Sequence, residues 1–212
     1  MRYRTVIFDL DGTLVDSSEG IVRGTEETLG ILGWPSMSRD EIRSYIGPPI
    51  GRAVSERNGY GKEGTAKFNA VFRDLYKDKY IMDVSVYPGM IDLLSDLSRE
   101  AFVAVATNKR DDLAKILLDG IGMAGFCNTV QGADFDGTLS KKDLIEKCMD
   151  VSKADKGNTV MIGDTVSDSD AAEECGIDFI GVTFGFGFKC GNDVRRGRAT
   201  NSVRSLRELL FD

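Results

Sequence analysis

Two carboxylates that follow an apolar run are the residues best suited to chemistry in this sequence. The run Thr5–Phe8 is typical of a buried parallel strand, and Asp9 and Asp11 come directly after it. Open α/β sheets place ligand sites at the carboxyl ends of their strands. Two carboxylates held there repel each other unless a cation or a shared proton compensates. With the turn at Gly12 and the hydroxyl of Thr13, the segment predicts a site for Mg²⁺ and an anionic substrate, with one carboxylate as a nucleophile. The alternative is an ordinary Asp-Gly turn.

The composition narrows the chemistry and the partners. None of the 212 residues is a histidine, which excludes a Ser-His-Asp triad, a Cys-His dyad and a His-ligated zinc site. Any metal is then expected to be held by oxygen, which favours Mg²⁺. The net charge of −7 argues against nucleic-acid binding. No apolar stretch has the length of a membrane span, and no signal peptide precedes the first strand, so we expect a cytoplasmic protein, monomer or homodimer, without membrane association.

Two more apolar runs end in polar residues. Residues 102–106 lead into Thr107 and Asn108, and residues 159–162 lead into a glycine followed by Asp164. The carboxyl ends of parallel strands lie at one edge of a sheet, so we expect these side chains to converge with the first pair of aspartates. Thr107 taken alone also suits a strand end or a helix N-cap.

A lysine and a further carboxylate complete the set. Lys141 opens a predicted helix, and Asp168 lies one helical turn after Asp164 and faces the same way. A hydroxyl, an ammonium and several carboxylates around one point suit phosphoryl transfer, because cations neutralise the phosphate oxygens and the hydroxyl orients them. Of the neighbours Lys141 and Lys142, the first shares a helix face with the apolar Leu144, so we expect Lys141 to point into the site.

Strands and helices alternate from residue 87 onward, which predicts a doubly wound parallel α/β sheet. Residues 15–86 carry helical patterns at 21–32, 39–46 and 66–80 and no convincing strand. We therefore expect an α/β core domain of residues 1–14 and 87–212. A helical cap domain of residues 15–86 is expected to be inserted over the carboxyl end of the sheet.

These motifs resemble those of the haloacid dehalogenase-like hydrolase superfamily. Its first motif, DxDGT, matches residues 9–13, and its threonine, lysine and GDxxxD motifs match Thr107, Lys141 and residues 163–168 in the same order. The resemblance implies a Rossmann-like core with an inserted cap. It is strongest to the phosphoglycolate phosphatase-like subgroup with a small helical cap, whose cap loop is similar to residues 46–52 and whose return to the core is similar to residues 87–90.

The resemblance also implies a role for each motif residue. Asp9 attacks phosphorus and forms an aspartyl-phosphate, and Asp11 protonates the leaving alkoxide and then activates water. Thr107, Asn108 and Lys141 bind the phosphoryl group. The expected Mg²⁺ ligands are the Asp9 carboxylate, the Asp11 backbone carbonyl and Asp164, with Asp168 as a ligand or as support for the ligands. In the cap loop, Gly47 and Arg52 are candidate substrate-binding residues. A plain interhelical turn explains Gly47 equally well, and a surface arginine explains Arg52 better than contact with a second anionic group does.

We therefore predict a Mg²⁺-dependent phosphatase that hydrolyses a small phosphorylated metabolite, such as a phosphoglycolate-like compound or a nucleotide or sugar phosphate. Asp11 favours ester hydrolysis over dehalogenation, because a halide leaves without a proton. A phosphomutase on the same core and a non-enzymatic phosphate-sensing module are the alternatives.

The DxDGT string occurs a second time, at residues 134–138. Here a glycine and small or polar residues replace the buried strand that a nucleophile needs for rigid support. We expect Asp134 to lie in a loop that leads to Lys141 and to have no catalytic role.

Overall fold

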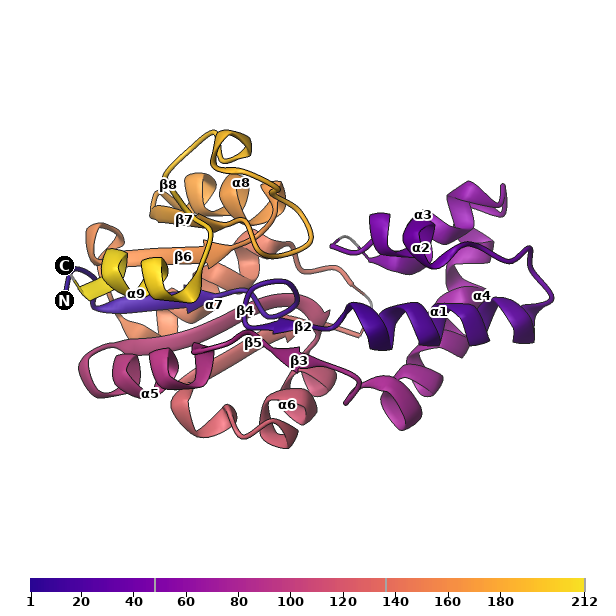
Figure 1. The fold of residues 1–212 in the computed structure, drawn as a ribbon, viewed down its shortest axis with the longest axis horizontal. Coiled ribbons are helices and arrows are strands. Elements are labelled where there is room, and N and C mark those ends of the chain that lie inside the picture. The colour runs from indigo at the N-terminus through magenta and orange to yellow at the C-terminus, as the bar shows by residue number, and fades with distance from the viewer. Residues whose placement is uncertain (48, 136, 212) are drawn as a thin grey trace. The chain divides into compact units, whose positions relative to one another are not determined.

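The structure is a computed structural model that describes residues 1–47, 49–135 and 137–211. The chain divides into two compact units, which we call the α/β unit and the helical unit (Figure 1). The α/β unit comprises Met1–Asp16 and Val86–Asp212, and the helical unit comprises Ser17–Ser85.

Six parallel strands form the sheet of the α/β unit, in the order β5-β4-β1-β6-β7-β8. They are β1 Thr5–Phe8, β4 Phe102–Arg110, β5 Thr129–Ala133, β6 Thr159–Gly163, β7 Asp178–Val182 and β8 Arg198–Thr200. The strand β1 lies between β4 and β6, and all of its residues are buried. The chain runs from β1 outward through β4 to β5 and then returns to the other side of β1 at β6. The predicted doubly wound sheet is confirmed, and its topological switch point lies at β1, where such folds bind ligands.

Helices cover both faces of this sheet (Figure 1). They are α5 Met90–Glu100, α6 Asp111–Gly120, α7 Lys141–Ser152, α8 Val166–Cys175 and α9 Val203–Phe211, with short 3₁₀ turns η2 Ala124–Phe126, η3 Lys156–Asn158 and η4 Gly191–Asp193. Each helix buries an apolar stripe. In α7, Leu144, Ile145 and Cys148 are fully buried and pack in one core cluster with Ile7 of β1 and Met161 of β6. The helices therefore fix the sheet and the positions of its strand ends.

The helical unit has its own apolar centre. Its helices are α1 Ser18–Leu32, α2 Arg39–Ser44, α3 Ile50–Arg57 and α4 Gly61–Leu75, followed by the π-helical turn η1 Tyr76–Tyr80. Where the chain passes between the two units, the short strands β2 Val15–Asp16 and β3 Ser85–Val86 pair with each other, although no strand was expected in residues 15–86. Phe68, Phe72 and Tyr76 stack along one helical face, with ring centroids 5.4 and 5.3 Å apart. The helix α3 is not among the patterns recognised in the sequence, because only Ile50 and Val54 mark its buried apolar side.

Two strands of the sheet differ from their expected extent. The strand β4 continues beyond residue 106 through polar residues to Arg110. No apolar run predicts the strand β8, because its three residues contain none. In the structure Arg198 pairs with Ile180 of β7 and donates a hydrogen bond to the Tyr3 hydroxyl at 2.8 Å. Tertiary pairing, not local composition, makes this segment a strand.

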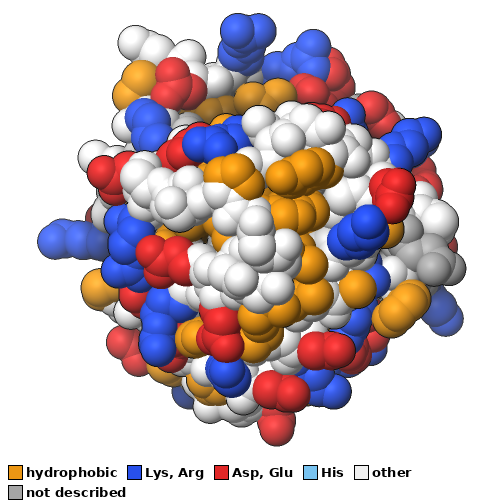
Figure 2. Space-filling view, turned by 90° about the vertical axis from the view of Figure 1, so that its right-hand side faces the viewer, with side chains coloured by type: hydrophobic (Ala, Val, Ile, Leu, Met, Phe, Trp, Pro, Cys, Tyr) orange, Lys and Arg blue, Asp and Glu red, His pale blue; other side chains and the backbone are white. Residues whose placement is uncertain are grey.

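Figure 2 shows basic and acidic side chains interspersed on the face it draws, with hydrophobic side chains between them. Among the residues that the structure describes, no helix has both the length and the apolar character needed to cross a membrane.

Candidate active site

Three neighbouring strands end at the same place in the α/β unit. Phe8 of β1 pairs with Val105 of β4 and with Ile162 of β6, so the residues that follow lie side by side at the carboxyl edge. This edge carries Asp9 after β1, Thr107 within β4 and Asp164 after β6. Oxygen atoms of Asp9, Asp164 and Asp168 lie within 4.8 Å of one another, and all three residues are buried. We call these three the carboxylate cluster.

Lys141 extends into the carboxylate cluster from the first turn of α7. Its Nζ lies 2.6 Å from Asp9 Oδ1 and 2.9 Å from Asp168 Oδ1, and its side chain is only 4% exposed. Ser140 caps this helix and exchanges hydrogen bonds with Asp143, which fixes where the helix begins. Lys142 turns away from the cluster, is 39% exposed and lies 3.8 Å from Glu146.

Asp164 is held by groups far from it in the sequence. Its Oδ2 accepts hydrogen bonds from the backbone N–H groups of Phe186 and Gly187, at 2.7 and 3.1 Å, and its Oδ1 accepts one from the Thr13 hydroxyl at 3.3 Å. Gly12 packs directly against this carboxylate: its φ is +84°, and a Cβ at this position would lie 2.4 Å from Asp164 Oδ2. The glycine of DxDGT is therefore required both for the turn and for the approach of Asp164.

Asp168 divides its two oxygens between a helix and the lysine. It is the third residue of α8, where its Oδ2 accepts hydrogen bonds from the backbone N–H and the hydroxyl of Thr165 at 3.0 and 2.7 Å. This capping box leaves Oδ1 to form the ion pair with Lys141. Asp168 thus links the first turn of α8 to Lys141.

The charges of the cluster do not balance within the protein. Burial raises the pKa of Asp9 to about 7, with Lys141 opposing the rise and the two neighbouring aspartates adding to it. Burial and the charge of Asp168 likewise raise the pKa of Asp164 to about 6. Burial disfavours the charge of Lys141, yet Asp168 and Asp9 hold its pKa above the ordinary value. One ammonium against three buried carboxylates leaves an excess of negative charge on oxygen ligands, which fits a hard divalent cation such as Mg²⁺.

These pKa shifts predict how stability depends on pH. A carboxyl group whose pKa is higher in the folded state stabilises the fold at low pH, and this contribution is lost as the pH rises through the folded-state value. The melting temperature of the metal-free protein should therefore fall between about pH 4 and about pH 7, and Mg²⁺ at pH 8 should raise it again. Asp9→Asn should reduce the fall, whereas Asp134→Asn, which changes a half-buried carboxylate whose pKa is lowered, should leave the fall between these pH values intact. A melting temperature that rises across this interval would contradict the prediction.

Asp11 points to a different partner from that of Asp9. Both oxygens of its carboxylate bind Lys109 Nζ, at 2.9 and 3.0 Å. Thr107 is buried, and its hydroxyl accepts a hydrogen bond from the backbone N–H of Lys109 at 3.1 Å, while Asn108 is half-buried beside it. Sequence reasoning assigned no role to Lys109, although its place directly after the predicted Thr107-Asn108 pair was a usable signal.

The two cap-loop candidates lie in the helical unit. Gly47 has a φ of +131° and precedes α3, and Pro48 beside it lies outside the described residues. Arg52 is 76% exposed at the start of α3 and donates a hydrogen bond to Glu56 at 2.8 Å. That bond joins neighbouring turns of α3 and does not bear on substrate binding. The roles of Gly47 and Arg52 in substrate binding stay predictions.

Asp134, in the second copy of DxDGT, binds groups of its own loop. Asp134 follows β5, and its carboxylate accepts hydrogen bonds from the backbone N–H and the hydroxyl of Thr138 and from the backbone N–H of Leu139. The hydroxyl of Thr138 lowers the pKa of Asp134, with the backbone groups adding to the effect. Asp136 lies outside the described residues. Asp134 therefore holds its own turn together and lies outside the carboxylate cluster.

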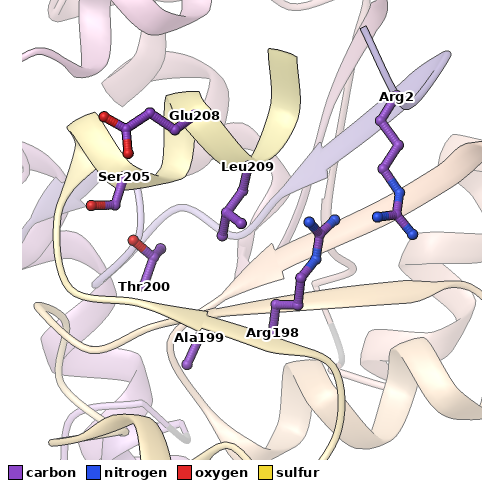
Figure 3. A pocket seen from close by; sticks show the side chains of 7 residues that line it. All are labelled: Arg2, Arg198, Ala199, Thr200, Ser205, Glu208 and Leu209. Carbon is purple, nitrogen blue, oxygen red and sulfur yellow. The ribbon is translucent and has the colours of Figure 1, made fainter. Parts of the chain in front are cut away.

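Figure 3 shows an open pocket of about 370 Å³ elsewhere in the α/β unit, between β8 and α9. Arg2 and Arg198 lie on one side of it and Glu208 on the other. Both guanidinium groups have partners: Arg2 pairs with Asp178 at 3.5 Å, and Arg198 donates to the Tyr3 hydroxyl. These contacts fasten the start of the chain to the edge of the sheet, which is a structural role.

The same chain resembles proteins of one family over most of its length. The model of the haloacid dehalogenase-like hydrolase family matches residues 6–182. A 5'-nucleotidase from Pseudomonas aeruginosa is 28% identical over 99% of this chain and 96% of its own. A phosphoglycolate phosphatase from Caulobacter vibrioides is 33% identical over 86% of this chain and 80% of its own.

A solved structure gives the same result for the fold. A predicted phosphatase from Clostridium acetobutylicum is 30% identical and superposes with a TM-score of 0.90 over 99% of each chain. The family model, the relatives and this structure all agree with the resemblance expected from the motifs. The protein belongs to the haloacid dehalogenase-like hydrolase family.

Proposed function

We propose that this hydrolase removes the phosphoryl group from a small phosphorylated metabolite through an aspartyl-phosphate on Asp9. The observation that carries the proposal is the buried carboxylate cluster with Lys141 at the switch point of the sheet. The relatives named as a 5'-nucleotidase and a phosphoglycolate phosphatase support a phosphate ester as the substrate class. Their two different substrates also indicate that the metabolite itself has to be found by experiment.

Asp9 has the position and the support that a nucleophile needs. Its backbone N–H donates to Ile162 at 2.8 Å, so the residue continues the buried sheet and is held rigidly. Lys141 binds Oδ1, and we assign the attack to Oδ2. A bond forms between Oδ2 and phosphorus while the bond from phosphorus to the ester oxygen breaks. Asp11 gives a proton to the leaving alkoxide and later takes one from the water that hydrolyses the aspartyl-phosphate.

The chain offers oxygen ligands for Mg²⁺ beside the nucleophile. Asp9 and Asp164 would hold the ion together with the backbone carbonyl of Asp11. We assign Asp168 to support, because one of its oxygens caps α8 and the other binds Lys141. When bound, Mg²⁺ supplies positive charge that neutralises the phosphoryl oxygens. Lys141 and the hydroxyl of Thr107 would hold and orient the remaining oxygens.

Activity should depend on the divalent cation. Without it, the buried negative charge of the cluster repels a phosphate dianion. EDTA should therefore silence the hydrolysis of p-nitrophenyl phosphate, and added Mg²⁺ should restore it, whereas zinc should substitute poorly at an all-oxygen site. Full turnover in excess EDTA would contradict the metal assignment.

The substrate test measures inorganic phosphate released with Mg²⁺ from a panel containing 2-phosphoglycolate, nucleoside 5'-monophosphates and sugar phosphates. We expect release from at least one of these compounds by the wild-type protein and none by Asp9→Asn. A phosphomutase would isomerise a sugar phosphate and release almost no phosphate. A phosphate-sensing module would bind a compound without converting it. Either outcome would overturn the proposed phosphatase.

We further propose that the helical unit acts as a cap that selects the substrate. Its chain begins at Ser17, shortly after the nucleophile, and returns to the α/β unit at Val86, which gives two short connections suited to hinge motion. Arg52→Ala should change the ranking of phosphate esters by kcat/KM more than it changes p-nitrophenyl phosphate hydrolysis. Arg204→Ala removes an equally exposed arginine of the α/β unit and should leave the ranking unchanged. An unchanged ranking for Arg52→Ala would place specificity elsewhere.

A further inference from the structure

One buried lysine of the α/β unit lies outside the carboxylate cluster. The side chain of Lys109 is 7% exposed and that of Asp11 is 18% exposed, and the Lys109 Nζ binds both oxygens of the Asp11 carboxylate. Contact with both oxygens restrains the position of the carboxyl group more than contact with one oxygen would. Burying the charge of a lysine costs free energy unless an opposite charge pairs with it. This pair is therefore held in place by its surroundings, whereas an exposed ion pair is mobile and contributes little.

An irregularity in the sheet places Lys109 there. Thr107 of β4 pairs with Gly132 of β5, but the next pair joins Arg110 to Ala133. The two intervening residues of β4, Asn108 and Lys109, therefore have no paired residue in β5 and form a bulge. Bulges of this kind re-aim a side chain and occur next to active sites. The backbone N–H of Lys109 donates to the hydroxyl of Thr107, which closes a local turn within the bulge.

The bulge depends on a glycine in the neighbouring strand. A Cβ at Gly132 would lie 2.7 Å from the carbonyl oxygen of Lys109 and 2.4 Å from the Cα of Asp111. The backbone N–H of Gly132 donates to the carboxylate of Asp111 at 3.2 Å. Both contacts involve backbone or a short side chain, so a larger residue would have to displace the segment that carries Lys109.

We infer that Lys109 is a positioning residue for Asp11 and that the β4 bulge is the device that aims it. Lys109 keeps the Asp11 carboxyl group in place and balances the negative charge that this group gains when its proton passes to the leaving oxygen. The inference rests on the proposed function, because it takes Asp11 as the acid and base of phosphate-ester hydrolysis. It assigns Lys109 no direct contact with the substrate, and therefore predicts that its removal matters only while Asp11 is present.

The test is a double-mutant cycle between Lys109→Met and Asp11→Asn, measured on p-nitrophenyl phosphate and on an alkyl phosphate that the wild-type protein hydrolyses. Lys109→Met should lower kcat on the alkyl ester by about 10- to 100-fold, the usual effect of removing a partner that orients a functional group. The loss on the aryl ester should be smaller, because p-nitrophenolate leaves without a proton. In the Asp11→Asn background the same change should have almost no further effect.

Two further variants separate positioning from a loss of structure. Lys109→Arg keeps a cation with several donors and should recover part of the alkyl-ester activity, and Lys142→Met, which removes an exposed lysine, should change neither substrate. If Lys109→Met does not fold, Gly132→Ala, which displaces the bulge while keeping the lysine, should show the same bias against alkyl esters. Far-ultraviolet circular dichroism and melting temperature verify the fold of each variant.

The outcomes distinguish this inference from the proposed function. Phosphate release by the wild-type protein and its loss in Asp9→Asn establish the phosphatase independently of Lys109. Given that result, equal losses on both esters, or a full additional loss in the Asp11→Asn background, would overturn the positioning role. A rise in KM restricted to substrates that carry a carboxylate would also overturn it, because Lys109 would then bind substrate directly.

Discussion

Asp9→Asn is expected to lower the turnover of p-nitrophenyl phosphate by at least about 10⁴-fold, the scale seen when an enzyme loses its nucleophile. The amide oxygen still accepts a hydrogen bond from Lys141, so the side chain keeps its place, but it no longer attacks phosphorus. Removing one of three crowded carboxylates also relieves repulsion. The variant should therefore be at least as stable as the wild-type protein in the absence of metal.

Asp134→Asn is the matched control, because it makes the same change in the other copy of DxDGT. Asp134 is half-buried and binds only its own loop among the contacts described, so activity should stay within about twofold of wild type, as substitutions away from the core usually do. Steady-state kinetics of the two variants test which aspartate is the nucleophile. Mass spectrometry of the acid-quenched protein should detect a phosphoryl group on wild type but not on Asp9→Asn. Substantial activity without Asp9, or its loss without Asp134, would reverse the choice of motif.

Lys141→Ala is expected to have the largest effect on activity and stability together. It leaves Asp9 and Asp168 buried without the ammonium that both contact. Removing one partner from a buried ion pair costs about 3–5 kcal/mol, and for a chain of this length that lowers the melting temperature by roughly 10 °C. Turnover should fall because the ammonium that we assign to the phosphoryl oxygens is lost.

Lys142→Ala provides the comparison at the next position of the same helix. Its ammonium is exposed and lies 3.8 Å from Glu146, a contact worth well under about 1 kcal/mol. The melting temperature of Lys141→Ala should approach that of wild type as the pH falls toward 5, because Asp9 and Asp164 then take up protons and need less compensation. A larger loss of kcat/KM or of stability in Lys142→Ala would reverse the assignment of the two lysines.

The order of apolar and polar residues was enough to predict a parallel sheet and the polar ends of its central strands. A parallel strand that is buried on both faces needs a continuous apolar run, and Thr5–Phe8 and Thr159–Gly163 provide one. The switch from apolar to polar after each run then marks the carboxyl edge without any knowledge of packing. The same local reasoning separated the two copies of DxDGT, because only Asp9 follows such a run.

The hydrogen-bond and ion-pair partners of the polar groups, by contrast, follow only from the folded structure. Phe186 and Gly187 bind Asp164 from a loop 22 and 23 residues further along the chain, and Lys109 binds Asp11 from another strand. The pattern of apolar residues does not predict such contacts, because they depend on how loops and bulges bring together backbone segments that are far apart in the sequence. The short strand β8 and the helix α3 were missed for the same reason: each contains too few apolar residues to show a pattern, and packing against neighbours gives it its structure.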